Sequence, residues 1–242
     1  MKQEYEVSSR ELNQYRKQLR KQLTAHDHKK PYDAEISLGK GEYLPAFSVH
    51  PQIMRPEVMT SIHLARYLHG NPKLYKGKRV LDVGAGSGLQ GVVMGLNGAK
   101  TVVFSDVDPH AIANSRENAR NLGIDKRSKF IVSDLFSKIK GKFHLIEFNH
   151  PFFEGISVEG QRVKGTMIAR SGLLGQFLKE AKRHLFPGGI LVMPFYHRAP
   201  KFNNPNERAR EFGYKAKEVL AKKARTGLQQ GPISIYILKP VK

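Results

Sequence analysis

Short apolar runs alternate with segments of helical periodicity through the central part of the chain. The runs that predict strands are 79–84, 101–106, 129–133, 143–148 and 188–194. The segments with helical spacing between them are 88–97, 109–122 and 166–186. Strands that alternate with helices in this way are typical of a mainly parallel sheet with helices on both faces. The pattern therefore predicts an α/β fold.

The two ends of the chain carry different patterns. Leucine and tyrosine side chains recur at helical spacing among basic residues, which predicts a basic amphipathic helix over 8–25 with a serine cap. The polar stretch 26–44 contains glycines and is predicted to be a linker. A second helix is predicted over 56–69, since proline suits a first helical turn. Near the other end, 214–224 and 232–239 are predicted to form a pair of strands.

The composition narrows the class of protein. The 242 residues are 40% hydrophobic, enough for one large globular domain, with or without a modest extension. Cysteine is absent, which excludes disulfides and thiolate metal ligands and favours a reducing compartment. No apolar run approaches the roughly 20 residues that cross a bilayer, and the start of the chain lacks the apolar core of a secretory signal. We therefore expect a cytoplasmic protein with no membrane partner and, from the spacing of His, Asp and Glu, no metal site.

The charge is strongly basic and unevenly distributed. The formal net charge is +20, and residues 161–242 hold 17 basic and only 4 acidic side chains. A basic surface of this size attracts polyanions. We therefore expect a nucleic-acid substrate or partner, although solubility or acidic lipid would also account for the charge.

A glycine-rich turn follows the first strand of the alternating region. Residues 82–88 read Asp-Val-Gly-Ala-Gly-Ser-Gly, where a dinucleotide fingerprint would have its third glycine at Leu89. Glycines at this point allow a tight turn and a close approach of the backbone to a ligand. Because ligands of parallel sheets bind beyond the carboxyl ends of the strands, this turn is a candidate cofactor site. The candidate residues are Asp82, Gly84, Ala85, Gly86 and Gly88.

Acidic residues end the next two strands. Asp106, which Val107 follows, lies 20 residues after Gly86 and can accept hydrogen bonds from both hydroxyls of a ribose. Asp134 can hold the exocyclic amine of an adenine, with Leu135 or Phe136 against the ring. Any one of these aspartates could simply cap the next helix. Their occurrence at successive strand ends favours a binding site for a nucleoside-type cofactor.

The fourth strand runs into Asn149-His150-Pro151-Phe152. Residues 80–153 resemble the class I, Rossmann-like S-adenosylmethionine-dependent methyltransferases, and the tetrapeptide is similar to their Asn-Pro-Pro-Phe/Tyr motif. The small-domain subset with this motif methylates planar nitrogens in rRNA, tRNA and DNA bases and in the glutamine of release factors. The resemblance implies a seven-stranded, mainly parallel sheet with a C-terminal antiparallel hairpin.

The resemblance also implies roles for the residues of the tetrapeptide. The Asn149 side-chain oxygen and the carbonyl of His150 would accept hydrogen bonds from the target NH₂ group, and Asn149 would also border the cofactor. Phe152 would stack on the plane of the target. His150 stands where the family has its first proline, so its carbonyl is kept as an acceptor but the rigidity that this proline gives the turn is lost. Its imidazole is either a plain turn residue or a group that contacts phosphate or takes up a proton.

A second resemblance lies upstream. Residues 53–58, Ile-Met-Arg-Pro-Glu-Val, are similar to the Ile-Pro-Arg-Pro-Glu-Thr segment that lies over the cofactor and target in the glutamine methyltransferases. The same residues would also suit an ordinary helix start, with proline at the first position and glutamate in the first turn. We predict an S-adenosylmethionine-dependent methyltransferase domain over 46–242 and a basic helical extension with a linker over 1–45.

Three hypotheses about function follow. The first is methylation of an exocyclic nitrogen of adenine or guanine in rRNA or tRNA, which the basic charge favours. The second is methylation of a glutamine amide on a translation factor or ribosomal protein, which Arg55-Pro56-Glu57 favours. The third is an RNA-binding module without catalysis, against which the intact motif argues.

Overall fold

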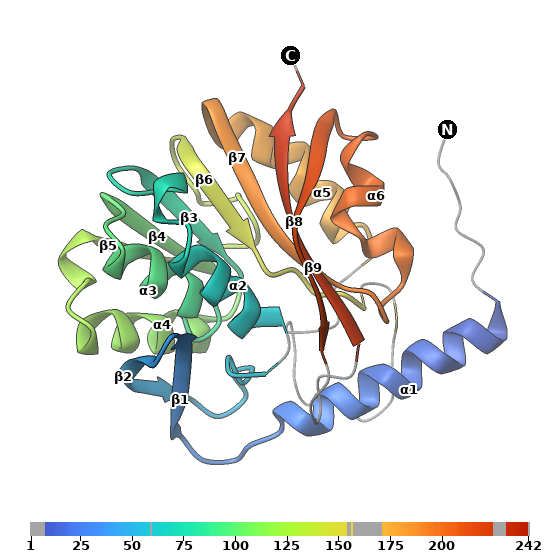
Figure 1. The fold of residues 1–242 in the computed structure, drawn as a ribbon, viewed down its shortest axis with the longest axis horizontal. Helices are drawn as coiled ribbons and strands as arrows, with labels where there is room; N and C mark the ends of the chain where they lie inside the picture. The colour runs from blue at the N-terminus through green and yellow to red at the C-terminus, as the bar shows by residue number, and fades with distance from the viewer. Residues whose placement is uncertain (1–7, 59, 154–155, 157–170, 225–230, 242) are drawn as a thin grey trace.

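A seven-stranded sheet forms the centre of the computed structural model, which describes residues 8–58, 60–153, 156, 171–224 and 231–241 (Figure 1). Its strands follow the order β5 (Ser128–Val132), β4 (Thr101–Asp106), β3 (Arg79–Val83), β6 (Phe143–Phe148), β7 (Leu185–Tyr196), β9 (Gly231–Pro240) and β8 (Tyr214–Ala224). Neighbouring strands from β5 to β7 are parallel, whereas β9 is antiparallel to both β7 and β8. The predicted α/β fold and its C-terminal antiparallel pair are confirmed.

Helices cover both faces of this sheet. They are α1 (Ser9–His26), α2 (Thr60–His69), α3 (Leu89–Leu96), α4 (Pro109–Asn121), α5 (Leu173–Ala181) and α6 (Pro205–Ala209), with short 3-10 turns η1 (Pro72–Leu74), η2 (Asp125–Arg127), η3 (Lys182–His184) and η4 (Lys201–Asn203). Residues of α2, α3 and α4 share one apolar core with Val80 of β3, whereas α1, α5 and α6 share the other with Leu81. Successive residues of a strand point to opposite faces, so both cores draw on each central strand.

The strand order reverses next to β3. The chain continues from β3 to β4 and β5 on one side, and β6 then pairs with β3 on the other side. In open sheets of this kind, ligands bind in the crevice beyond the carboxyl ends of the strands at such a reversal. The fold therefore places a candidate site at the ends of β3, β4 and β6.

Two helices are shorter than the sequence pattern predicts. α2 begins at Thr60 rather than at Pro56, because residues 55–58 form a turn that the Val58 N–H closes by donating to the Arg55 carbonyl. α5 ends at Ala181, whereas the prediction extended this helix to residue 186; its first residues, 166–170, lie outside the described residues. Leu185 pairs with Phe143 of β6, so pairing with the sheet outweighs helix propensity there.

The linker predicted over residues 26–44 is wrong for most of its length. Residues 32–49 form a two-stranded antiparallel sheet, β1 (Tyr32–Gly39) and β2 (Glu42–Val49), joined by a tight turn at Lys40 and Gly41, both with positive φ. Alternate residues of β1 are buried, which is the period of a half-buried strand. The predicted domain boundary between residues 45 and 46 thus falls inside β2.

The predicted N-terminal helix is confirmed as α1. Ser8 and Glu11 form a capping box, in which each side chain accepts from the other residue's backbone N–H. Leu19 is fully buried, and the Gln18 amide donates to the Tyr196 hydroxyl at the end of β7 over 2.7 Å. Figure 1 shows α1 running along the lower end of the sheet, toward which β6 and β7 run. None of the helices in the described ranges has both the length and the apolar character needed to cross a membrane.

Candidate active site

The glycine-rich turn after β3 forms one wall of a cavity. Gly86 has φ +54°, and a side chain added there would meet nothing closer than Ile53, at 4.0 Å, so its backbone is open toward the cavity. Gly88 faces the other way: a Cβ there would lie 2.8 Å from the Cβ of Ser115 in α4. Gly84, Ala85 and Gly86 line the cavity, whereas Gly88 allows the turn to pack on α4.

Asp106 at the end of β4 is fixed by backbone groups. Its two carboxylate oxygens accept from the N–H groups of Gly86 and Asp108, each over 3.0 Å. Burial raises the pKa of Asp106 above its usual value, and these two bonds oppose that rise. Asp108, not Asp106, caps α4, by accepting from the His110 N–H. Asp106 therefore lies at the cavity with acceptor capacity beyond its two backbone bonds.

The turn after β5 brings Asp134 and Leu135 to the same cavity. Leu135 has φ +46°, and its carbonyl accepts from the Ser133 hydroxyl over 3.0 Å. Phe136 instead packs against Phe177 and His184 in the core. Of the two residues predicted to contact an adenine ring, only Leu135 is in a position to do so.

Asn149 lies at the cavity wall, directly after β6, and its amide is held from both sides. The Thr60 hydroxyl donates to its oxygen over 3.0 Å, and its nitrogen donates to the Ser61 hydroxyl over 2.8 Å. Thr60 is 2% exposed, so this contact is shielded from water. The sequence gives no sign of this arrangement, because the partners lie almost 90 residues apart.

The side chain of His150 points away from the cavity. It is 2% exposed, and its Nε2–H donates to the Asn203 carbonyl over 2.8 Å. Burial lowers the pKa of His150 to about 4, so the ring is neutral near pH 7. The suggestion that it contacts phosphate or takes up a proton is wrong, because the ring is enclosed and fastened to η4.

Phe152 also belongs to the core in this structure. It is 5% exposed and makes edge-to-face contacts with His150 and Phe195. The Asn203 amide donates to the Phe152 carbonyl over 3.0 Å. This bond helps Pro151 to fix the turn after β6. Pro151 lines the cavity, whereas Phe152 does not.

Asp82 lies behind the glycine turn rather than at the cavity. It is 1% exposed, accepts from the Gly91 N–H over 2.8 Å and lies opposite Glu147 in the pairing of β3 with β6. Burial, with the charge of Asp82, raises the pKa of Glu147 well above its usual range; burial raises that of Asp82 to about 6. Both carboxyl groups therefore favour the protonated form more than exposed acids do, and Asp82 anchors the start of α3 beneath the turn.

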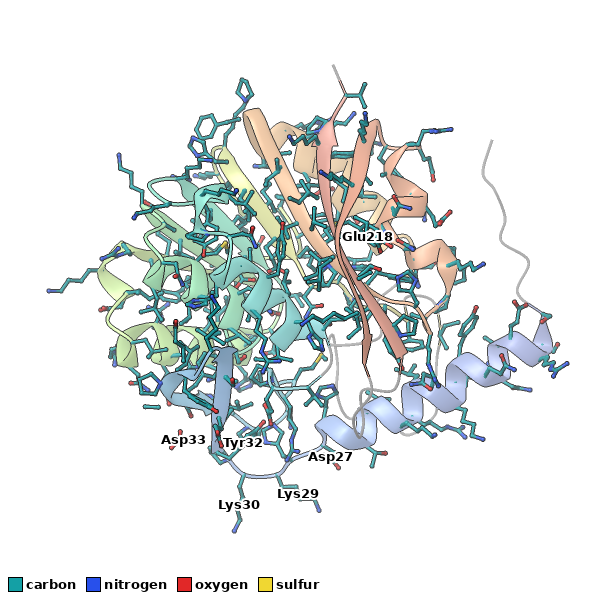
Figure 2. All side chains as sticks on the ribbon, viewed as in Figure 1. Asp27, Lys29, Lys30, Tyr32, Asp33 and Glu218 are labelled. Atoms are coloured by element: carbon teal, nitrogen blue, oxygen red, sulfur yellow. The ribbon has the colours of Figure 1, made fainter. Side chains whose placement is uncertain are left out.

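Residues 53–58, hereafter the strap, form one wall of the cavity. Ile53, Met54 and Pro56 line it. The strap is fastened to the N-terminal region: the Arg55 N–H donates to His26 Nδ1 over 3.0 Å, and the Ile53 carbonyl lies 2.9 Å from His28 Nε2. Figure 2 shows this region at the lower edge of the molecule.

The side chains of the strap are held as well. The Arg55 guanidinium lies over the ring of Tyr32, 5.2 Å from its centroid. The Tyr32 hydroxyl donates to the Glu57 carboxylate, at 2.9 and 3.1 Å from its two oxygens. None of these contacts was foreseen from the sequence, although the strap segment itself was.

The complete cavity is a partly open pocket lined by both polar and apolar groups, as is usual for small-molecule sites. It combines the strap, the glycine turn, Asp106 to Asp108, Ser133 to Leu135, and Asn149 with Pro151. In the described ranges, no group of three His, Asp or Glu residues is placed to bind a metal. The arrangement offers acceptors for hydroxyl and amine groups on one side, and a fixed amide oxygen on the other.

Comparisons with known proteins agree with this geometry. The family model of the methyltransferase small domain matches residues 60–218. The chain is similar to a putative protein N5-glutamine methyltransferase of Methanocaldococcus jannaschii, with 32% identity over 152 residues, 59% of this chain and 72% of the relative. It is also similar to ribosomal RNA small subunit methyltransferase C of Chromohalobacter salexigens, with 32% identity over 117 residues, 48% of this chain and 31% of the relative.

A solved structure shows the same fold. The T. thermophilus 16S rRNA N2 G1207 methyltransferase, in complex with AdoMet and guanosine, matches 87% of this chain and 50% of its own with a TM-score of 0.60 at 17% identity. The present chain thus spans half or less of these two rRNA-modifying proteins, but 72% of the archaeal relative.

Proposed function

Because the chain belongs to the methyltransferase small-domain family and is an S-adenosylmethionine-dependent methyltransferase, we propose that it methylates an exocyclic nitrogen of adenine or guanine in rRNA or tRNA. The observation that carries this proposal is Asn149, whose amide is fixed at the cavity wall by Thr60 and Ser61. The net charge of +20 favours RNA over a neutral substrate.

The described residues fit S-adenosylmethionine, which supplies an electrophilic methyl group when it is bound. Asp106 would accept from the ribose hydroxyls, since each of its oxygens keeps a lone pair after its backbone bond. The open backbone at Gly86 would face the polar end of the cofactor, and Asp134 with Leu135 its base. Val107, which is 59% exposed, would cover the outer side of the site.

Asn149 would orient and polarise the target nitrogen. The lone pair of an aryl amine is delocalised, so acceptors facing its hydrogens must draw the nitrogen toward tetrahedral geometry. Thr60 occupies one lone pair of the Asn149 oxygen, and the other can accept from the target. The carbonyl of His150 would be the second acceptor. The His150 ring is neutral and enclosed, so it is not the base that removes the proton.

A second candidate is methylation of a glutamine amide on a translation factor or ribosomal protein. The archaeal relative, of which the chain covers 72%, carries that activity in its name, and the strap over the cavity includes Arg55-Pro56-Glu57. An amide nitrogen poses the same chemical problem as an aryl amine, so the same acceptors would serve both.

We further propose that the enzyme works in the cytoplasm, as the absence of cysteine suggests.

Transfer of a labelled methyl group distinguishes the two substrates. The protein would be incubated with labelled S-adenosylmethionine and either deproteinised total RNA or ribosomal and soluble protein. We expect the labelled methyl group to be in RNA, so that ribonuclease releases the label and protease does not. Asn149→Ala should reduce transfer by at least about 100-fold and leave cofactor binding by calorimetry within about 2-fold, since the amide acts on the target. Label that follows only the protease-sensitive fraction would replace the RNA proposal with the glutamine one.

A further inference from the structure

A row of cations covers the solvent side of α1. This cationic row consists of Arg16, Lys17, Arg20 and Lys21, and the last three are exposed. Together with Asn13 and Thr24 these side chains line a shallow, open hollow on the helix surface. The spacing places them on one face over successive turns, so the row follows the helix axis.

The cationic row does not help α1 to fold. Arg16 and Arg20 are four residues apart, as are Lys17 and Lys21, and like charges at this spacing repel one another. The one carboxylate of the helix, Glu11, is committed to Ser8 at the cap. In the described ranges no ion pair offsets the row.

The opposite side of α1 provides its stability and fixes its place. Leu19 is fully buried, and Leu12, Tyr15 and Leu23 pack on the same core. This excludes a helix that lies in a membrane surface, because the apolar side that would enter the lipid is already covered by protein. What remains free is a charged side alone.

The helix that carries the cationic row is bonded to the strap, part of which lines the cavity. Gln18, which lies between Lys17 and Arg20 in the sequence, donates to the Tyr196 hydroxyl at the carboxyl end of β7, and His26 at the end of α1 accepts from the strap. Met54, which lines the cavity, packs on the same core as Leu19. Figure 2 shows Lys29 and Lys30 projecting from the body of the protein just beyond α1, with Asp27 and Asp33 nearby.

We propose that the cationic row of α1 binds the phosphate backbone of the RNA substrate and so brings the target base to the cavity. The proposal rests on the proposed function, because it takes RNA as the substrate. A line of cations that forms no ion pair among the described residues matches a polyanion with regularly spaced charges, and phosphate contacts of this kind position a nucleic acid without reading its sequence. An acidic protein surface is the alternative occupant, and the experiment below distinguishes it.

The test compares two variants that each lose four positive charges. The row variant is Arg16→Gln, Lys17→Gln, Arg20→Gln and Lys21→Gln; glutamine keeps helix propensity. The control variant is Lys126→Gln, Lys129→Gln, Lys215→Gln and Lys217→Gln, all exposed and placed at or near the starts of β5 and β8. Both should keep the circular dichroism spectrum and bind S-adenosylmethionine within about 2-fold of the original protein.

Binding of a labelled single-stranded RNA of about 20 nucleotides would be followed by fluorescence anisotropy over a range of salt. The row variant should bind at least about 10-fold more weakly, and its dependence of log K on log salt should flatten by about 2 to 3, near 0.7 for each lost contact. The KM for RNA in methyl transfer should rise and kcat should change little. The control variant should lose less than about 3-fold in affinity.

Equal losses in the two variants would overturn the proposal in favour of bulk charge. The proposal would also be overturned if the row variant bound RNA with unchanged affinity but captured an acidic ribosomal protein more weakly. The proposed function can fail while the docking proposal stands. In that case the original protein transfers no methyl group to RNA, but only the row variant loses RNA binding, so α1 binds RNA that the enzyme does not methylate. If RNA is methylated with the same KM by the row variant, the function stands and the docking proposal falls.

Discussion

At the scale of single residues, the site depends on side chains that hold other side chains. Asn149 is fixed by two hydroxyl groups that lie 88 and 89 residues earlier in the chain. Without them the amide could rotate or exchange its oxygen and nitrogen positions, and the acceptor would no longer face the target. Thr60 and Ser61 are therefore positioning residues, which act through Asn149.

Thr60→Val tests this role. Valine has nearly the shape of threonine but has no hydroxyl, so the buried contact to Asn149 is lost without a cavity. We expect kcat to fall about 10-fold, as for one lost hydrogen bond of about 1 to 1.5 kcal/mol, with cofactor affinity unchanged. Thr60→Ser keeps the hydroxyl and should restore most of kcat in steady-state assays. A normal kcat for Thr60→Val would show that Asn149 needs no such support.

The same scale explains what the sequence could and could not predict at the site. Asp106 and Asn149 follow strands that the apolar pattern marks, and parallel strands end at one edge of a sheet, so their common location was foreseeable. Thr60 was not, because a contact over 89 residues leaves no periodic signal. The direction of the His150 side chain was missed for a related reason: its acceptor, the carbonyl of Asn203, comes from a turn 53 residues later.

At the scale of elements, the N-terminal segments hold the strap over the cavity. α1 ends in His26, which binds the Arg55 N–H, while β2 is bonded to α4 through Ser48 and Asn118. The Asn118 amide also donates to the Ser87 carbonyl in the glycine turn. The sequence does not predict the hairpin β1–β2, because its buried residues alternate with exposed ones over two short strands and its glycines and charged residues are also typical of a linker. This hairpin replaces a flexible connection with a fixed one.

His26→Leu should loosen the strap. Burial lowers the pKa of His26 to about 4, so at pH 7 its ring is neutral and Nδ1 is a free acceptor for the Arg55 N–H. Leucine offers no acceptor, and we expect S-adenosylmethionine affinity, measured by calorimetry at pH 7, to fall about 5-fold or more. His26→Asn retains an acceptor and should bind more nearly normally. Equal affinities for all three proteins would mean that the strap does not depend on this contact.

At the scale of the whole molecule, the buried carboxyl pair makes stability depend on pH. Glu147 has a folded-state pKa raised well above 4.5, so its contribution is fully present below about pH 4.5 and is lost as the pH rises through the folded value. Above about pH 4.5 the Glu147 carboxyl releases its proton in the unfolded chain. The folded protein must then either keep this proton or bury a second negative charge beside Asp82. Asp82, with a pKa of about 6, shares this cost.

Glu147→Gln should remove most of this cost, because its amide can donate to Asp82 without a proton from solution. We expect the free energy of unfolding to exceed that of the original protein by about 1 to 3 kcal/mol at pH 8, and the difference to vanish near pH 4. Urea unfolding at a series of pH values measures it. A difference that is constant with pH would show that Glu147 is not protonated in the fold.

The contact between Gln18 and Tyr196 joins residues 178 positions apart. During synthesis, α1 leaves the ribosome long before β7 exists, so its apolar side has no partner while most of the chain is being made. In that interval the apolar side of the helix is uncovered, and its basic side emerges next to the polyanionic RNA of the ribosome. Completion of the sheet is then also the event that covers the apolar side of α1 and leaves only its cationic side exposed to RNA.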